Sequence, residues 1–239
     1  MTISTIDESQ RKSAKVAGFS YVLIILLSVL KLIFLGNLMV PGNDAATTSN
    51  IRAHELLFRV GVASDVIVFV LVVVLSLALY VILRTINKSL ALFALLMRFG
   101  EAILGGLITL LGGLIPLLLL NRGAGSETDQ LRALVGLFLS AGTAGLNIVL
   151  IFMGLGGTVF CYLFFKSKYI PGILAAWGML TYLSMLILSF VSIVSPNLPE
   201  MIAIVLYTPG ALFELIIGLW LGFKGLRPPG IAEPGKASA

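Results

Sequence analysis

The chain has 239 residues, of which 59% are hydrophobic and only 11% are charged, and its mean hydropathy is +1.08. Soluble domains carry roughly a quarter charged residues because their surfaces must interact with water. The composition therefore excludes a soluble globular protein, a disordered chain and a disulfide-stabilised secreted module. The formal net charge is +5 at pH 7. The positions of the basic residues show whether this excess of positive charge indicates nucleic-acid binding or the orientation in a membrane.

Six apolar stretches are long enough to cross the hydrocarbon core of a membrane as helices, which takes about 20 residues each. They cover residues 17–40, 56–83, 89–120, 133–165, 170–195 and 201–223. The alternation of apolar and polar residues that marks β-strands is absent from them, which excludes a β-barrel. The third and fourth stretches are long enough that they must tilt strongly, kink or begin with an interfacial segment. The sequence predicts an all-α membrane bundle of six transmembrane helices.

The basic residues between the stretches predict the orientation, because cytoplasmic loops carry most of the Lys and Arg. Ten lie on the side of the two termini: Arg11, Lys12, Lys15, Arg84, Lys88, Lys166, Lys168, Lys224, Arg227 and Lys236. Three lie on the opposite side: Arg52, Arg122 and Arg132. Both termini are therefore expected in the cytoplasm. The other three of the 16 basic residues lie within the predicted spans, so none is left to form a nucleic-acid surface.

Three regions follow from this orientation. Residues 1–16 form a cytoplasmic N-terminal segment, residues 17–225 form the transmembrane domain, and residues 226–239 form a disordered cytoplasmic tail rich in Pro, Gly and Ala. We expect a multi-pass protein of the inner or plasma membrane.

Six charged residues lie within the predicted spans, and Glu55 lies at the outer end of the second. An unpaired charge at the centre of a transmembrane helix costs about 2.5–3.5 kcal/mol. Six would cost on the order of 15–20 kcal/mol, so most must pair, become neutral or face a hydrated cavity. The orientation divides the charges into an inner layer of Arg98, Glu101 and Glu214 and an outer layer of Lys31, Glu55, Arg59 and Asp65. Both layers are candidate sites, and their spacing allows Arg98 to pair with Glu101 (i, i+3) and Glu55 with Arg59 (i, i+4) along one helix.

Glycine and proline accompany the inner-layer acids. The sixth stretch carries a four-residue repeat made of Gly210, Glu214, Gly218 and Gly222. Faces of small residues allow helices to approach closely in lipid, so Glu214 is expected to point into the bundle. Pro209 in the sixth stretch and Pro116 in the third each remove a backbone hydrogen bond. A broken helix beside a buried carboxylate is a common way to build an ion or proton site.

Several segments, taken in order, resemble one known family. They are Asn50-Ile51 with Glu55-Leu56-Leu57-Phe58-Arg59 and Asp65, Arg98-Phe99-Gly100-Glu101-Ala102, Lys166-Ser167-Lys168-Tyr169-Ile170-Pro171, and Glu214-Leu215 with Leu219-Trp220-Leu221 and Lys224-Gly225. The set resembles the bacterial integral-membrane family described as domain of unknown function 4386, over residues 12–225. The resemblance implies a multi-spanning membrane protein. It implies no activity, substrate or cofactor, so no residue roles follow from it.

Metal, cofactor and thiol chemistry have little support in the sequence. His54 is the only histidine and Cys161 the only cysteine, whereas a catalytic zinc site takes three protein ligands. His54 is expected to be a loop residue and Cys161 a small core residue. We therefore predict no metal and no cofactor.

Three functional classes remain open. The first is a small-solute or ion/proton transporter-like protein in which Arg98, Glu101 and Glu214 form a binding or coupling site. The second is a non-catalytic scaffold, sensor or lipid-binding accessory subunit in which the charges only fix helix packing. The third, and least favoured, is an intramembrane enzyme that uses Asp65 or Glu55 on a lipid-derived substrate. The expected partners are membrane lipids, with a small molecule or ion, a second copy of the chain and an unidentified membrane protein left open.

Overall fold

The computed structural model describes residues 6–40, 42–122, 128–195 and 200–228, without the side chains of 122 and 200–206. All regular secondary structure in this part of the chain is helical, which confirms the all-α prediction. The elements are α1 (Glu8–Leu35), η1 (Gly36–Leu38), α2 (Asp44–Ala53), α3 (Glu55–Leu83), α4 (Lys88–Thr109), η2 (Leu110–Leu114), α5 (Ile115–Arg122), α6 (Asp129–Ser167), α7 (Gly172–Val194), α8 (Glu200–Leu219) and η3 (Trp220–Lys224).

Five segments of the described chain are long and apolar enough to cross a membrane. They are Glu8–Leu38, Glu55–Leu83, Lys88–Asn121, Asp129–Ser167 and Gly172–Val194. These segments coincide with the first five predicted stretches and indicate a multi-pass membrane protein. The sixth predicted stretch coincides with α8 and η3, part of which has undescribed side chains. A sixth span and cytoplasmic termini therefore stay predictions.

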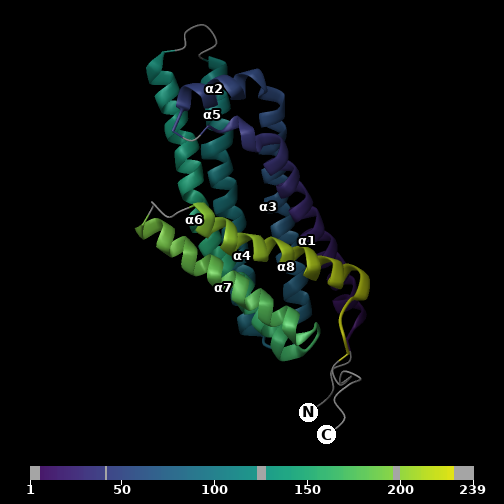
Figure 1. The fold of residues 1–239 in the computed structure, drawn as a ribbon. Coiled ribbons are helices and arrows are strands. Elements are labelled where there is room, and N and C mark those ends of the chain that lie inside the picture. The colour runs from purple at the N-terminus through teal and green to yellow at the C-terminus, as the bar shows by residue number, and fades with distance from the viewer. Residues whose placement is uncertain (1–5, 41, 123–127, 196–199, 229–239) are drawn as a thin grey trace.

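The helices form a bundle that is built differently at its two ends (Figure 1). Helices α1, α3, α4 and α6 run along its length, whereas α7 and α8 cross them obliquely at one end. Gln10 Nε2 on α1 donates to the Ile82 carbonyl near the end of α3, at 2.9 Å. Arg227 N, just after η3, donates to the Tyr169 carbonyl just after α6, at 2.8 Å. One end of the bundle therefore contains the start of α1 and the ends of α3, α6 and η3. We call it the basic end.

The opposite end contains α2, a short helix that lies between the first and second predicted stretches. Asn43 begins α2, because its side-chain oxygen accepts a hydrogen bond from Ala46 N at 2.9 Å. Thr47 Oγ1 accepts from Val40 N at 3.0 Å, and Ile51 is fully buried. An asparagine followed by an aspartate is a typical helix start, so the signal for α2 was present in the sequence.

The third and fourth predicted stretches are longer than a membrane span requires, and they differ in structure. The third bends through η2, a π-helical turn in which Ile115 N donates to the Leu110 carbonyl. Pro116 follows directly and has no N–H, so the preceding turn loses one helical donor. The fourth is the uninterrupted helix α6 of 39 residues. At 1.5 Å per residue α6 is about 58 Å long, well beyond the roughly 30 Å hydrocarbon core.

Glycines let α1 cross α8 and η3 at backbone contact. A Cβ added to Gly18 would lie 2.6 Å from Gly222 Cα and 2.7 Å from the Gly218 carbonyl oxygen. A Cβ added to Gly218 would lie 2.8 Å from Tyr21 Cβ. The glycine face of the sixth stretch is therefore a helix-packing face, as the four-residue repeat predicted.

This contact predicts that Gly18→Ala destabilises the protein. The new methyl group would meet backbone atoms that have no alternative rotamer, and such overpacking costs about 1–3 kcal/mol. Gly106→Ala on α4 is the matched control, because its Cβ would meet nothing within 4 Å. Thermal unfolding in detergent should show a lower midpoint for Gly18→Ala only. Equal midpoints for the two variants would contradict the packing.

Candidate functional site

The inner-layer charges lie where α1, α4, α7 and α8 meet. Arg98 Nη1 and Glu101 Oε2, one turn apart on α4, form an ion pair at 2.8 Å. Both side chains are buried. The i,i+3 spacing predicted this pair, since it places the two side chains on one helix face.

The third inner acid, Glu214 on α8, is held by tyrosines from two other helices. Tyr182 Oη on α7 donates to Glu214 Oε1 at 2.7 Å. Tyr21 Oη on α1 lies 3.5 Å from Tyr182 Oη. Because the Tyr182 hydroxyl proton is directed at Glu214, Tyr21 is the donor in that contact. The hydrogen bonds therefore run from α1 through α7 to α8.

Arg98 joins the pair and the tyrosine chain into one group. Its guanidinium interacts electrostatically with Glu214 as well as with Glu101, and Glu214 is the acceptor of the Tyr182 hydroxyl. We call this group the inner cluster; it consists of Tyr21, Arg98, Glu101, Tyr182 and Glu214. The structure thus brings together all three residues of the predicted inner layer. The two tyrosines were not predicted, although a buried tyrosine hydroxyl in an apolar helix generally has a hydrogen-bond partner.

Glycines of α6 make room for the cluster. A Cβ added to Gly156 would lie 2.8 Å from Arg98 Cγ, and one added to Gly157 would lie 2.6 Å from the Tyr182 ring. Two successive glycines on one helix therefore seat side chains from α4 and α7. The result is a closed polar cluster, with Arg98, Glu101 and Glu214 each at most 6% exposed.

The outer layer divides into two separate ion pairs. Lys31 Nζ on α1 contacts both carboxylate oxygens of Asp65 on α3, at 2.6 and 2.7 Å. Glu55 and Arg59 pair along α3 at 2.6 Å, with side chains 41% and 47% exposed. The helical spacing predicted the second pair. It did not predict the first, which depends on how α1 packs against α3.

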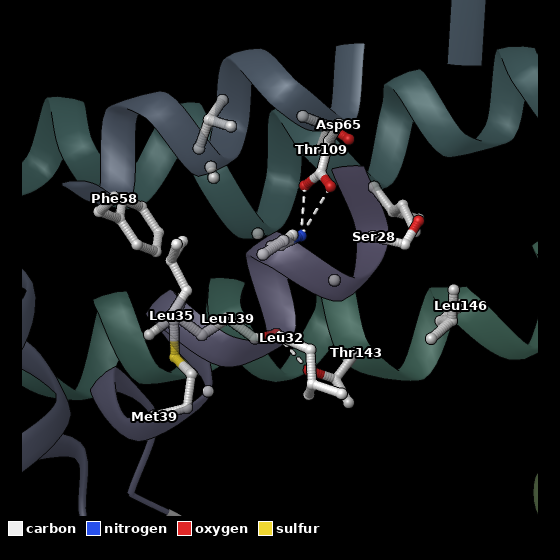
Figure 2. A pocket seen from close by; sticks show the side chains of 18 of the residues that line it. Ser28, Leu32, Leu35, Met39, Phe58, Asp65, Thr109, Leu139, Thr143 and Leu146 are labelled. Atoms are coloured by element: carbon white, nitrogen blue, oxygen red, sulfur yellow. Dashed lines mark hydrogen bonds and ion pairs between the residues drawn. The ribbon is translucent and has the colours of Figure 1, made fainter. Parts of the chain in front are cut away.

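The Lys31–Asp65 pair lies in the wall of a cavity of about 470 Å³ (Figure 2). Small-molecule sites typically occupy 300–1,000 Å³. These two residues are the only charged side chains among those that line the cavity. Most of the remaining wall is apolar and comes from α1, α3, α4, η2 and α6, as Phe58 and Leu139 illustrate in Figure 2.

The π-helical turn η2 forms part of this wall through Gly112 and Gly113. A Cβ added to Gly142 on α6 would lie 2.8 Å from Gly112 Cα, so the two backbones are in contact there. The carbonyl that would accept from residue 116 has no donor, because that residue is proline. Such π-turns occur frequently at functional sites.

The other candidates lie apart from this cavity. Glu55 lines a second cavity of about 290 Å³ between α2 and α5. His54 ends α2, and Cys161 is buried in the core. Over the residues that the structure describes, no group of three or more His, Cys, Asp or Glu side chains is placed to hold a metal ion. Neither of the two cavities is lined by the inner cluster.

The chain belongs to the family described as domain of unknown function (DUF4386), whose family model matches residues 16–225. This confirms the resemblance drawn from the sequence. No curated protein and no solved structure matches the chain. The family description assigns no activity, so a function has to be argued from the geometry.

The hydrogen bonds from Tyr21 through Tyr182 to Glu214 predict that Tyr182→Phe destabilises the protein. The change removes a hydrogen bond to a buried carboxyl group, which is worth about 1.5–3 kcal/mol when the acceptor is charged. Tyr162→Phe, which removes the same atom from an exposed side chain of α6, is the control. Thermal unfolding should separate the two variants.

A double-mutant cycle with Glu214→Gln measures the same contact directly. Because Tyr182 and Glu214 share one hydrogen bond, the combined loss of stability should be smaller than the sum of the two single losses. Strict additivity would show that the two side chains do not interact.

Proposed function

We propose that this member of the DUF4386 family binds a small amphipathic molecule in the cavity around Lys31 and Asp65, within the cell membrane. The observation that carries the proposal is an apolar cavity of about 470 Å³ with a single ion pair as its charged feature. An apolar ligand body fits the aliphatic and aromatic wall. A polar head fits the ion pair, which offers both an ammonium donor and a carboxylate acceptor.

The ion pair is accessible enough to meet such a head group. The Lys31 and Asp65 side chains are 41% and 25% exposed, whereas Arg98 and Glu101 are 3% and 5% exposed. A ligand can therefore reach the Lys31–Asp65 pair without separating the packed helices. Ser28, Thr109 and Thr143 add hydroxyl groups to the same cavity.

The role of the inner cluster in this proposal is structural. It is buried, its hydrogen bonds link α1, α7 and α8, and its ion pair lies on α4. Truncating one partner of a buried ion pair is strongly destabilising, so the cluster fixes how α4, α7 and α8 pack beneath the cavity. The predicted orientation places this cluster in the cytoplasmic half of the membrane and the cavity in the outer half.

Replacing the cavity's ion pair by uncharged side chains of similar size tests the proposal. We expect Lys31→Met combined with Asp65→Asn to fold, because a neutral replacement of both partners is often tolerated. The control replaces the other outer pair, as Glu55→Gln with Arg59→Met, and makes equivalent charge changes outside this cavity. The probe is decanoic acid that carries a photoreactive diazirine on its chain, added to the purified protein in lipid nanodiscs.

The proposal predicts crosslinks on the peptides that contain Phe58 and Leu139, which face the cavity. Loss of the ion pair should reduce this labelling about tenfold, since one charge-assisted hydrogen bond contributes roughly 1.5–3 kcal/mol. The control double variant should be labelled to the same extent as the unmodified protein. If the Lys31→Met, Asp65→Asn variant is labelled as strongly as the unmodified protein, the probe crosslinks to the lipid-facing surface and not to the cavity.

A second candidate is a proton- or ion-coupled transporter, and one feature of the inner cluster favours it. A single guanidinium faces two carboxyl groups, Glu101 and Glu214, so one acid has no cation of its own. Buried acids within a membrane are common elements of proton pathways. This candidate expects Glu214→Gln to abolish a pH-driven flux into vesicles while the protein still inserts and folds. Unchanged flux in that variant would eliminate it.

A further inference from the structure

The segment after η3 contacts the chain just after α6. Gly225, where the chain leaves η3, has a positive φ of 69°, in the region that favours glycine. Arg227 N then donates to the Tyr169 carbonyl at 2.8 Å. Lys168 directly precedes Tyr169 and is exposed. Basic residues from two distant segments, around 168 and around 227, are therefore held side by side at the basic end.

A tryptophan lies at the centre of this arrangement. Lys224 Nζ is 4.6 Å from the centroid of the Trp220 ring, and Arg227 Cζ is 4.9 Å from it. Both distances are within the roughly 6 Å range of cation–π contacts. The Trp220 indole N–H is buried and has no hydrogen-bond acceptor in the described part of the chain. Two cationic groups therefore lie over one aromatic ring, whose own N–H has no acceptor among the described residues.

The positive charges in this group are not balanced by acids. Among the described residues neither Lys224 nor Arg227 forms an ion pair with a carboxylate. Their two charges lie less than about 10 Å apart, which is close to one Debye length, so they repel each other. The ring contacts hold the cations in place despite this repulsion, and an anion between them would relieve it.

We propose that Lys224 and Arg227, which contact the Trp220 ring, bind the phosphate of an anionic phospholipid headgroup at this end of the bundle, where Lys168 adds a further positive charge. Guanidinium and ammonium groups are the usual ligands of phosphate, and arginine contacts two of its oxygens at once. Tryptophan is enriched where membrane helices meet the headgroup region, because one side of the ring is apolar and the N–H is polar.

The apolar surface next to the cations favours a lipid over a free phosphate ion. Phe223 adjoins Lys224 and is 79% exposed, and Phe165 near the end of α6 is 49% exposed. These side chains offer a surface for acyl chains beside the donors for the headgroup. A ligand that has both a phosphate and hydrocarbon chains uses both features, whereas inorganic phosphate uses only one.

Fluorescence of Trp220 provides a local readout for this site. The chain has two tryptophans, so a Trp177→Phe background leaves Trp220 as the only one. The full chain in this background is placed in vesicles of phosphatidylcholine and phosphatidylglycerol. Bromine atoms, which quench tryptophan on contact, are carried on the acyl chains of one lipid or the other. The proposal expects brominated phosphatidylglycerol to quench Trp220 more strongly than brominated phosphatidylcholine at the same mole fraction.

The variant Lys224→Gln with Arg227→Gln should lower this preference for the anionic lipid about tenfold, because two basic contacts are removed. The matched control is Arg84→Gln with Lys88→Gln, which removes the same charge at the same end from exposed positions between α3 and α4. The control should keep the preference. An equal loss in both variants would mean that only the general surface charge attracts the lipid, and it would overturn the proposal.

Two further measurements keep the result specific. Equal thermal unfolding midpoints for the two double variants show that a lost preference does not come from a loss of folding. Inorganic phosphate is then added to the vesicles as a competitor. If millimolar phosphate abolishes the preference for phosphatidylglycerol, the site binds free phosphate and the lipid proposal is wrong; an unchanged preference supports the lipid.

Discussion

The organisation of this protein follows from the cost of leaving a charge without a partner in hydrocarbon. The charged side chains that the sequence places within the predicted spans form ion pairs in the structure, along one helix or between two, except Glu214, which accepts a hydrogen bond from Tyr182. Pairs between helices have a second effect, because they fix the relative position of the helices they join. Lys31 and Asp65 do this for α1 and α3, and Tyr182 and Glu214 do it for α7 and α8.

Glycine makes these polar contacts geometrically feasible. In lipid there is little hydrophobic driving force between helices, so association depends on close packing and hydrogen bonds. Gly156 and Gly157 bring α6 near enough to enclose Arg98 on one side and Tyr182 on the other. Gly18 likewise lets α1 approach η3, which places Tyr21 within reach of Tyr182. Small residues and charged residues therefore act together in this bundle.

The sequence predicted contacts within a helix better than contacts between helices. The pairs Arg98–Glu101 and Glu55–Arg59 followed from the helical repeat alone, and the five helices that are long and apolar enough to cross a membrane followed from length and hydropathy. The bond from Tyr182 to Glu214 could not be derived in this way, because it depends on the relative rotation and depth of α7 and α8.

Two local features had partial signals in the sequence. Asn43 at the start of α2 matches a known helix-capping pattern, so that helix could have been predicted. Pro116 marked a break in the third stretch, but a proline does not specify whether the chain kinks or widens into a π-turn. The cavity beside η2 had no signal, because it arises from the way four distant segments diverge.

The position of the cavity follows from the unequal construction of the two ends. Helices α7 and α8 cross only the basic end (Figure 1), where the inner cluster and the α6 glycines close the bundle. None of the residues that line the larger cavity comes from α7 or α8. Along α1, Lys31 lies ten residues beyond Tyr21, or about 15 Å at the helical rise. The closed polar cluster thus lies where α7 and α8 cover the bundle, and the half of the bundle that lacks these two helices contains the cavity.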